Sequence, residues 1–151
     1  MGKFKIVKNI FFTVVILITI TSCNRTNNDG TNIIEISERM FLTHARDVYM
    51  NPAGYLGRTI KLEGIFTRER FNDNELFFVF RRIPGCHIPE ENFGFEVKWP
   101  EGRRDPYPPD NAWVEATGVL KYVIENRQRF LYLELLSLRV LNTRGQEFVT
   151  R

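Results

Sequence analysis

The sequence predicts a mainly β protein: a small five-stranded OB-like barrel preceded by one helix, behind a lipoprotein signal peptide and a polar tether. Three observations lead to this fold class. One segment with helical periodicity is followed by five segments of strand character, most of them with alternating apolar residues. Gly64 and Gly118 lie inside two of these segments, where a strand must bend or coil. Residues 76–82 are apolar on both faces over much of their length, which favours a barrel over an open sheet with one wet face.

The helix is expected directly after a short strand. Residues 33–36 have strand character, and Ser37 is a suitable N-cap for a helix over residues 38–50. Asn51 and Pro52 end this helix, because proline disfavours helical geometry at the residue before it. Gly54 and Gly57 bracket the turn that follows. The predicted apolar stripe of the helix comprises Met40, Phe41, Ala45, Val48 and Tyr49.

The strands of the barrel follow this turn. Short polar segments at 72–74 and 125–128 are expected as turns, and 83–92 and the proline-rich stretch 100–110 as longer connections. An α+β half-open sheet capped by the helix is the alternative architecture. The predicted strands span residues 59–68, 76–82, 93–99, 113–124 and 129–141.

The N-terminus has the features of an export signal. Residues 1–8 are cationic, residues 10–20 are apolar apart from two threonines, and small residues precede Cys23. The apolar run is too short for a transmembrane helix, which needs about 20 residues. The segment Ile20-Thr21-Ser22-Cys23 resembles the lipobox of bacterial lipoproteins, which implies cleavage before Cys23 and acylation of its sulfur. An ordinary signal peptide with an incidental cysteine, or a short uncleaved anchor, is the alternative.

These features divide the chain into three parts. We expect a signal peptide over 1–22, a lipidated Cys23 with a tether through residue 32, and the OB-like domain over 33–149. The tether contains no apolar residue after Cys23, so it has nothing to pack into a core. The predicted location is the cell envelope, lipid-anchored to a bacterial membrane with the domain outside the cytoplasm. Inner and outer membrane stay open as alternatives.

The charge pattern argues against nucleic acid as a partner. The formal net charge is +3, but three lysines are the only charged residues among the first 22, so the chain is neutral from Cys23 onward. Such a domain lacks the net positive charge that dominates nucleic-acid affinity.

A set of arginines and aromatic residues is expected near one rim of the barrel, a combination that single-strand-binding OB domains use. Solvated strand ends are the simpler interpretation of these charges. If a ligand binds at the rim, a small anionic or sugar-like molecule fits better than nucleic acid, with Arg68, Arg81 and Arg82 as the candidate binding residues. The other members of the set are Arg70, Phe71, Phe78, Arg103, Arg104 and Tyr107.

Cys86 and His87 are the candidate metal ligands, because a thiolate and an imidazole suit zinc or copper. Glu90, Glu91 and His44 are further candidates near them. Adjacent residues rarely point at one ion, however, and no CxxC or HxxH spacing supports the pair. A free cysteine and a solvent-facing histidine are the alternative.

No catalytic motif is recognised, and the chain is predicted not to be an enzyme. Cys86 would need a base at hydrogen-bond distance to act as a nucleophile, and the neighbouring His87 has the wrong geometry. The segments Trp99-Pro100 and 106–109 are either a surface for a partner or a stiff loop packed on its own barrel.

Several segments of the domain resemble one family of bacterial envelope proteins. These are 34–37 leading into an aromatic-bearing helix, Tyr55 to Phe66, Phe78 to Arg82 with a cysteine shortly after, and Asn111 to Gly118. Over about 110 residues the chain is similar to the soluble C-terminal domain of the YcgQ-like permease subunits, whose function is largely undefined.

The resemblance implies an OB-like domain that faces the envelope and works beside a membrane protein. The family carries transmembrane helices ahead of this domain, where this chain has a lipobox. The family also tends to carry a Cys-Cys pair where this chain has Gly85-Cys86, which leaves a single thiol.

These observations together predict a membrane-anchored lipoprotein that acts as a non-catalytic binding or assembly module, accessory to a membrane permease. The alternative is a metal-ion or small-anion binding protein that serves a transporter. No cofactor is expected, with zinc at Cys86 and His87 as the one candidate.

Overall fold

The computed structural model describes residues 33–71, 74–84, 91–125 and 127–149. A short strand β1 (Ile34–Ile36) precedes a 3-10 turn η1 (Glu38–Met40), the helix α2 (Phe41–Met50) and a second 3-10 turn η2 (Pro52–Gly54). The remaining strands are β2 (Thr59–Phe71), β3 (Asn74–Ile83), β4 (Glu91–Lys98), β5 (Trp113–Glu125) and β6 (Gln128–Val140). In the described ranges, no helix combines the length and the hydropathy that a bilayer crossing requires.

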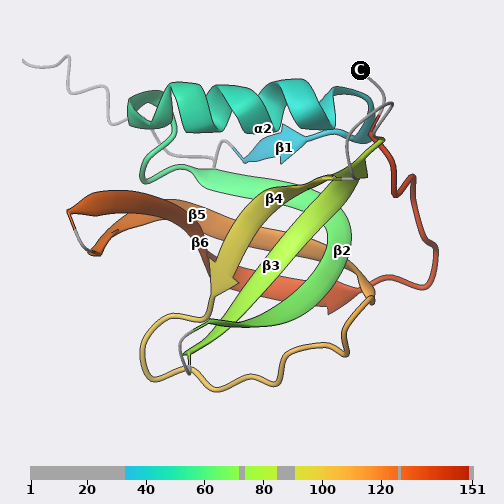
Figure 1. Ribbon diagram of the computed structural model, residues 1–151. Helices are drawn as coiled ribbons and strands as arrows, with labels where there is room; N and C mark the ends of the chain where they lie inside the picture. The colour runs from blue at the N-terminus through green and yellow to red at the C-terminus, as the bar shows by residue number, and fades with distance from the viewer. Residues whose placement is uncertain (1–32, 72–73, 85–90, 126, 150–151) are drawn as a thin grey trace, which may run out of the picture. The chain divides into compact units, whose positions relative to one another are not determined.

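The five long strands among the described residues close into a barrel (Figure 1). Their order is β2-β3-β4-β6-β5, and β5 pairs again with β2, which closes the circle. The β4–β6 pairing is parallel and the other barrel pairings are antiparallel. A closed five-stranded barrel with this crossover is the OB-like architecture expected from the sequence, and the half-open alternative is excluded.

Closure depends on β2, which pairs with two partners in succession. Its first half, Thr59 to Ile65, faces β5, and its second half, Ile65 to Phe71, faces β3. Gly64 lies at this change of partner, where an added Cβ would lie 2.6 Å from the carbonyl oxygen of Phe80. The bend that the sequence placed at Gly64 is therefore a point of close backbone approach.

A bulge lies beside the second glycine, Gly118, where the sequence predicted that the strand must bend or coil. The register between β5 and β6 shifts between Thr117 and Gly118. The extra residue increases the local twist of the strand, which a small barrel needs in order to close.

The core fills the barrel and extends to the helix. α2 and β1 lie together over one end of the barrel (Figure 1), and α2 buries Phe41, Leu42, Ala45 and Val48. The core also includes residues of β1 and of the C-terminal segment, namely Ile36 and Val149. Its barrel members include Ile60, Leu62, Phe66, Val79, Phe95, Val97, Val114, Ala116, Leu120, Leu133 and Leu135.

The helix differs from its prediction at two points. It starts with the 3-10 turn η1, and Ser37 makes no capping hydrogen bond through its side chain. Met40 belongs to this turn and stays exposed, because a 3-10 turn has three residues per turn and changes the phase of the stripe. Tyr49 also stays partly exposed, because it lines a groove at the surface.

Candidate functional site

The proposed lipidation site and most of the candidate metal ligands lie outside the described residues. Cys23, Cys86, His87 and Glu90 belong to this group, so zinc binding stays a prediction. Glu91 begins β4, and His44 lies half-buried on α2. Within the ranges that the structure describes, no group of three or more His, Cys, Asp or Glu side chains is arranged to hold a metal ion.

The three candidate arginines do not share one cluster. Arg68 on β2 lies opposite Phe77, and its guanidinium lies 5.5 Å from the centroid of that ring. Arg81 and Arg82 lie toward the end of β3, four and five residues beyond Phe77, or roughly 13–17 Å along a strand. The sequence predicted a cluster near one rim of the barrel, whereas Arg68 of β2 lies opposite the first half of β3 and the other two arginines lie toward its end.

Arg81 is an internal side chain with only 1% of its surface exposed. Its Nε donates a hydrogen bond to the carbonyl oxygen of Glu63 at 2.9 Å, and its Nη1 donates to that of Gln146 at 3.0 Å. The carboxylate of Glu38 lies 3.3 Å from the same nitrogen. Burial lowers the pKa of Arg81, and the charge of Glu38 opposes that change. These contacts occupy Arg81 within the fold.

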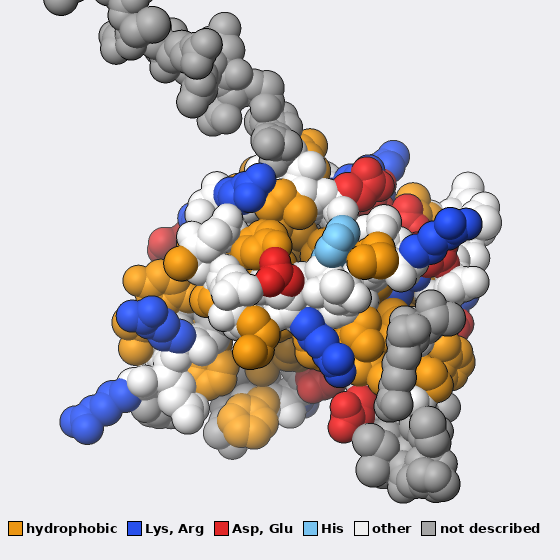
Figure 2. Space-filling model, turned by 90° about the horizontal axis from the view of Figure 1, so that it is seen from above, with side chains coloured by type: hydrophobic (Ala, Val, Ile, Leu, Met, Phe, Trp, Pro, Cys, Tyr) orange, Lys and Arg blue, Asp and Glu red, His pale blue; other side chains and the backbone are white. Residues whose placement is uncertain are grey.

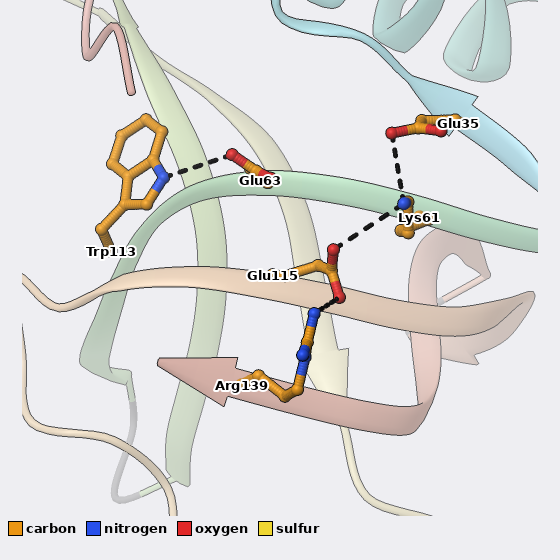
Figure 3. A network of polar contacts seen from close by, with 6 residues as sticks. All are labelled: Glu35, Lys61, Glu63, Trp113, Glu115 and Arg139. Atoms are coloured by element: carbon orange, nitrogen blue, oxygen red, sulfur yellow. Dashed lines mark hydrogen bonds and ion pairs between the residues drawn. The ribbon is translucent and has the colours of Figure 1, made fainter. Parts of the chain in front are cut away.

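Two aromatic rings complete the surroundings of Arg81. Its guanidinium carbon lies 5.1 Å from the ring centroid of Phe41 and 4.9 Å from that of Trp113. The indole nitrogen of Trp113 donates to the carboxylate of Glu63 at 3.4 Å (Figure 3). A guanidinium is the cation best suited to such a site, because its planar faces stack while its edges donate hydrogen bonds.

A second polar feature crosses the outer face of four strands. Glu35 of β1, Lys61 of β2, Glu115 of β5 and Arg139 of β6 alternate in charge (Figure 3). Lys61 lies 3.2 Å from Glu35 and 3.7 Å from Glu115, which in turn lies 2.7 Å from Arg139. The hydrogen bond to Glu35 raises the pKa of Lys61. Because each charge faces an opposite charge, this ladder joins neighbouring strands and offers no unpaired group for chemistry.

The proline-rich connection packs on its own barrel, which was one of its two interpretations. The ring of Tyr107 stacks on Phe77 with centroids 3.7 Å apart, and its hydroxyl accepts a hydrogen bond from the backbone N–H of Trp99 at 3.2 Å. Arg103 covers the other aromatic ring, with its guanidinium carbon 4.2 Å from the centroid of Trp99. The aromatic residues of this loop are therefore used for intramolecular packing.

An open aromatic groove is the feature best suited to binding. It consists of two adjoining hollows with volumes of about 430 Å³ and 300 Å³, which share Tyr49 and Phe78. These volumes lie near the lower end of the range for small-molecule sites, about 300–1,000 Å³. The groove lies on the outer face of β3 and β4, the face through which OB-folds bind their ligands. Its other lining residues include Leu56, Glu96, Tyr122, Arg129, Phe130 and Leu131.

The groove exists because β5 and β6 extend beyond the barrel. Leu120 faces the core and is fully buried, but Tyr122 and Ile124, the next residues on that face, are 44% and 60% exposed. The helix ends at Met50, so no further turn of it covers this part of the hairpin. The apolar face that fills the barrel therefore continues into solvent as one wall of the groove.

Tyr49 links the helix to the opposite wall. Its hydroxyl donates a hydrogen bond to the carbonyl oxygen of Gly94 at 2.7 Å, and its ring stacks on Phe95 with centroids 5.3 Å apart. Burial raises the pKa of Tyr49 to about 12, and the carboxylate of Glu96 adds to the rise. The hydroxyl thus stays protonated at neutral pH and remains a donor.

The polar groups of the groove are few and stand at its margins. Glu96 pairs with Lys98 at 2.9 Å, and the guanidinium carbon of Arg129 lies 5.4 Å from the ring centroid of Tyr122. Glu69 lines the second hollow. Aromatic walls with few charged residues are suited to holding apolar groups, whereas a reaction would need a base and a nucleophile in contact. Among the lining residues, the sequence assigned only Phe78 to a ligand-binding rim, and it assigned Tyr49 to the apolar stripe of the helix. The apolar alternation that continues past Leu120 was the signal that could have identified the others.

Comparison with known proteins agrees with this fold. The sequence model of the DUF1980 C-terminal domain, a domain of unknown function, matches residues 21–149. The chain belongs to the DUF1980 C-terminal domain family. This membership confirms the resemblance to a C-terminal domain of undefined function that the sequence suggested. Comparison with curated proteins gave no match.

Among solved structures, the DUF1980 domain is similar to the dimeric N-terminal domain of PriB protein from Thermoanaerobacter tencongensis. The sequence identity is 15% and the TM-score is 0.31, over 56% of this chain and 97% of the other.

Proposed function

We propose that this chain is a membrane-anchored bacterial lipoprotein whose domain binds a neighbouring membrane permease without catalysing a reaction. The observation that carries the binding role is the aromatic groove on the β3–β4 face, which is open, largely apolar and lined by three charged residues. The lipobox and the polar tether support the anchoring part of the proposal, and the family resemblance supports the permease as partner.

The chemistry of the groove favours a protein segment over a small anion. Its walls present Tyr49, Phe78 and Tyr122, and its charged lining residues are Glu69, Glu96 and Arg129. Aromatic side chains with adjacent polar groups are the residues most enriched at protein interfaces. An anion would face the carboxylate of Glu96 as well as the guanidinium of Arg129, so the groove has no excess positive charge to hold it.

The proposal is tested by capture of the tagged full-length protein from its native cells in mild detergent. We expect the wild-type protein to carry an acyl group and to bring down a permease-like membrane protein in stoichiometric amount. Phe78→Lys places a charge in the groove and is expected to reduce the recovered partner by at least about tenfold, because such a change removes an interfacial anchor. Leu136→Lys is the matched control, since Leu136 is exposed on β6 and lines neither hollow.

Two outcomes contradict the proposal. If the Cys23→Ala variant still associates with the membrane, the lipid-anchoring part of the proposal is wrong. If the bait is acylated but captured without companions, the permease part of the proposal is wrong. The metal-ion or small-anion alternative then replaces it, and metal analysis of the wild-type protein and of Cys86→Ser tests its metal branch.

A further inference from the structure

The β5–β6 hairpin carries exposed apolar residues on both of its faces. Tyr122 and Ile124 continue the core face, whereas Phe130 pairs with Val123 on the opposite face. Tyr122, Ile124 and Phe130 are 44%, 60% and 43% exposed. A hairpin that covered only its own domain would keep one face polar. Apolar side chains on both faces indicate that the end of this hairpin enters an apolar environment.

Basic residues accompany this apolar end. Residues 121–134 contain three basic and two acidic side chains, and Arg127 and Arg129 are exposed beside the turn. Lys121 is already paired with Glu134 at 2.6 Å, which leaves Arg127, Arg129 and the exposed Glu125 as the outward charges, a net charge of +1. Figure 2 shows orange hydrophobic and blue basic side chains side by side at its left edge, the side from which the hairpin projects in Figure 1. Aromatic and basic residues in this combination are typical of the membrane–water interface.

The strand register shows which way the hairpin points relative to the N-terminus. β1 runs parallel to β2, with Ile34 opposite Ile60, and β5 runs antiparallel to β2, with Ile60 opposite Gly118. The direction from β1 back toward the tether is therefore the same as the direction along β5 toward the hairpin turn. The chain enters the domain from the side on which the hairpin projects.

The lengths of the two elements match. Glu125, the last residue of β5 before the hairpin turn, lies seven residues beyond Gly118, or about 23 Å beyond the level of Ile34. If the ten residues from Cys23 to Ile33 act as the expected tether, a flexible chain of that length has a root-mean-square span of about 16–19 Å and a maximum near 35 Å. An acylated Cys23 would thus hold the domain at a distance that the hairpin can bridge.

From these observations we infer that the end of the β5–β6 hairpin docks on the lipid bilayer, with Ile124 and Phe130 in the interface. The inference rests on the proposed anchoring at Cys23 and deepens it, because the anchor and the hairpin become two contacts with one membrane. Two contacts restrict rotation about the tether. The groove beside Tyr122 then opens at the membrane surface, where a permease segment would meet it.

The test uses the full-length acylated protein in vesicles of phosphatidylcholine and phosphatidylglycerol, with bromine atoms on the acyl chains as quenchers of tryptophan. Ile124→Trp places a probe at the hairpin end, and Phe130→Trp is a second, independent probe. Leu136→Trp is the control on β6, at a site that is 51% exposed and leads away from the turn. Trp99 and Trp113 give the same background in every variant.

We expect the fluorescence of both hairpin probes to be quenched at least twofold more strongly than that of Leu136→Trp. Equal quenching of all three probes in vesicle-bound protein overturns the docking and leaves the lipid anchor intact. Burial of the hairpin probes only in native membranes, and not in pure lipid, also overturns it and assigns the hairpin to a protein partner. Protein that does not remain with the vesicles contradicts the proposed anchoring itself.

Discussion

At the scale of single residues, Gly94 has the least room for a side chain. A Cβ at this position would lie 2.1 Å from the carbonyl oxygen of Val79 and 2.5 Å from the Cα of Phe80. Both contacts are with backbone atoms, so the neighbours cannot rotate away. The same absence of a side chain leaves the carbonyl oxygen of Gly94 accessible to the hydroxyl of Tyr49. One glycine thus determines both the packing of β3 on β4 and the position of a groove wall.

Gly94→Ala is therefore expected to lower the free energy of unfolding by about 3 kcal/mol, at the upper end of the usual cost of overpacking. Gly54→Ala is the matched control, because a Cβ at Gly54 has no atom within 4 Å and its backbone is not left-handed. The control should change stability by less than about 0.5 kcal/mol, or raise it slightly. Urea unfolding followed by tryptophan fluorescence measures both, and equal stabilities would show that β3 and β4 can separate without cost.

At the scale of elements, the segment after β6 is attached to the barrel mainly through β3. The backbone N–H of Arg82 donates to the carbonyl oxygen of Glu147 at 2.8 Å, and that of Val149 donates to the carbonyl oxygen of Arg82 at 2.9 Å. Next to this bridge, the buried side chain of Arg81 reaches Gln146 and Glu38. Arg81 thus contacts both the C-terminal segment and η1, which are also joined directly by the backbone N–H of Gln146 donating to the carboxylate of Glu38.

Arg81→Ala is expected to lower the free energy of unfolding by about 3–5 kcal/mol, because it leaves the carbonyl oxygens of Glu63 and Gln146 without this donor and creates a cavity between two aromatic rings. Arg81→Lys should restore little of this loss, since an ammonium neither donates along a planar fork nor stacks between two rings. Arg139→Ala, which breaks an ion pair on the exposed ladder, should cost no more than about 1 kcal/mol.

Chemical denaturation of the three proteins provides the comparison. A loss in Arg81→Ala no larger than that in Arg139→Ala would mean that water can replace the buried contacts, and the C-terminal segment would then not depend on this side chain.

At the scale of the whole molecule, the fold was predictable where a single strand carries its own pattern. Alternation identified the five barrel strands, and Gly64 and Gly118 marked the places where they bend. The sequence predicted a barrel but not the β2–β5 pairing that closes it, because strand register depends on two strands together. Four of the five barrel strands also proved longer than their patterns, since paired residues beyond the core are free to be polar, whereas β6 has the predicted length shifted by one residue.

The site was less predictable for the same reason. Arginine is usually a surface residue. Arg81 is internal because Phe41 and Trp113, which are distant in sequence, pack against its guanidinium. The groove combines residues from α2, β3, β4 and the β5–β6 hairpin, so no one segment contains its signal. Tyr49 was assigned to the buried stripe of α2, whereas its ring serves both the core and the groove.

One core joins all these elements, and this leads to a last prediction. The main cluster of buried residues includes Ile36 of β1, four residues of α2, members of all five barrel strands and Val149. Because no element has a separate core, losing one should expose the others, and a domain of this size should unfold in a single step. Far-UV circular dichroism, which reports on the sheet and the helix, and tryptophan fluorescence, which reports on Trp113, should give the same urea midpoint. A helical signal that is lost at lower urea than the tryptophan signal would show instead that α2 detaches from a barrel that is stable alone, and that the groove wall at Tyr49 can open independently of the sheet.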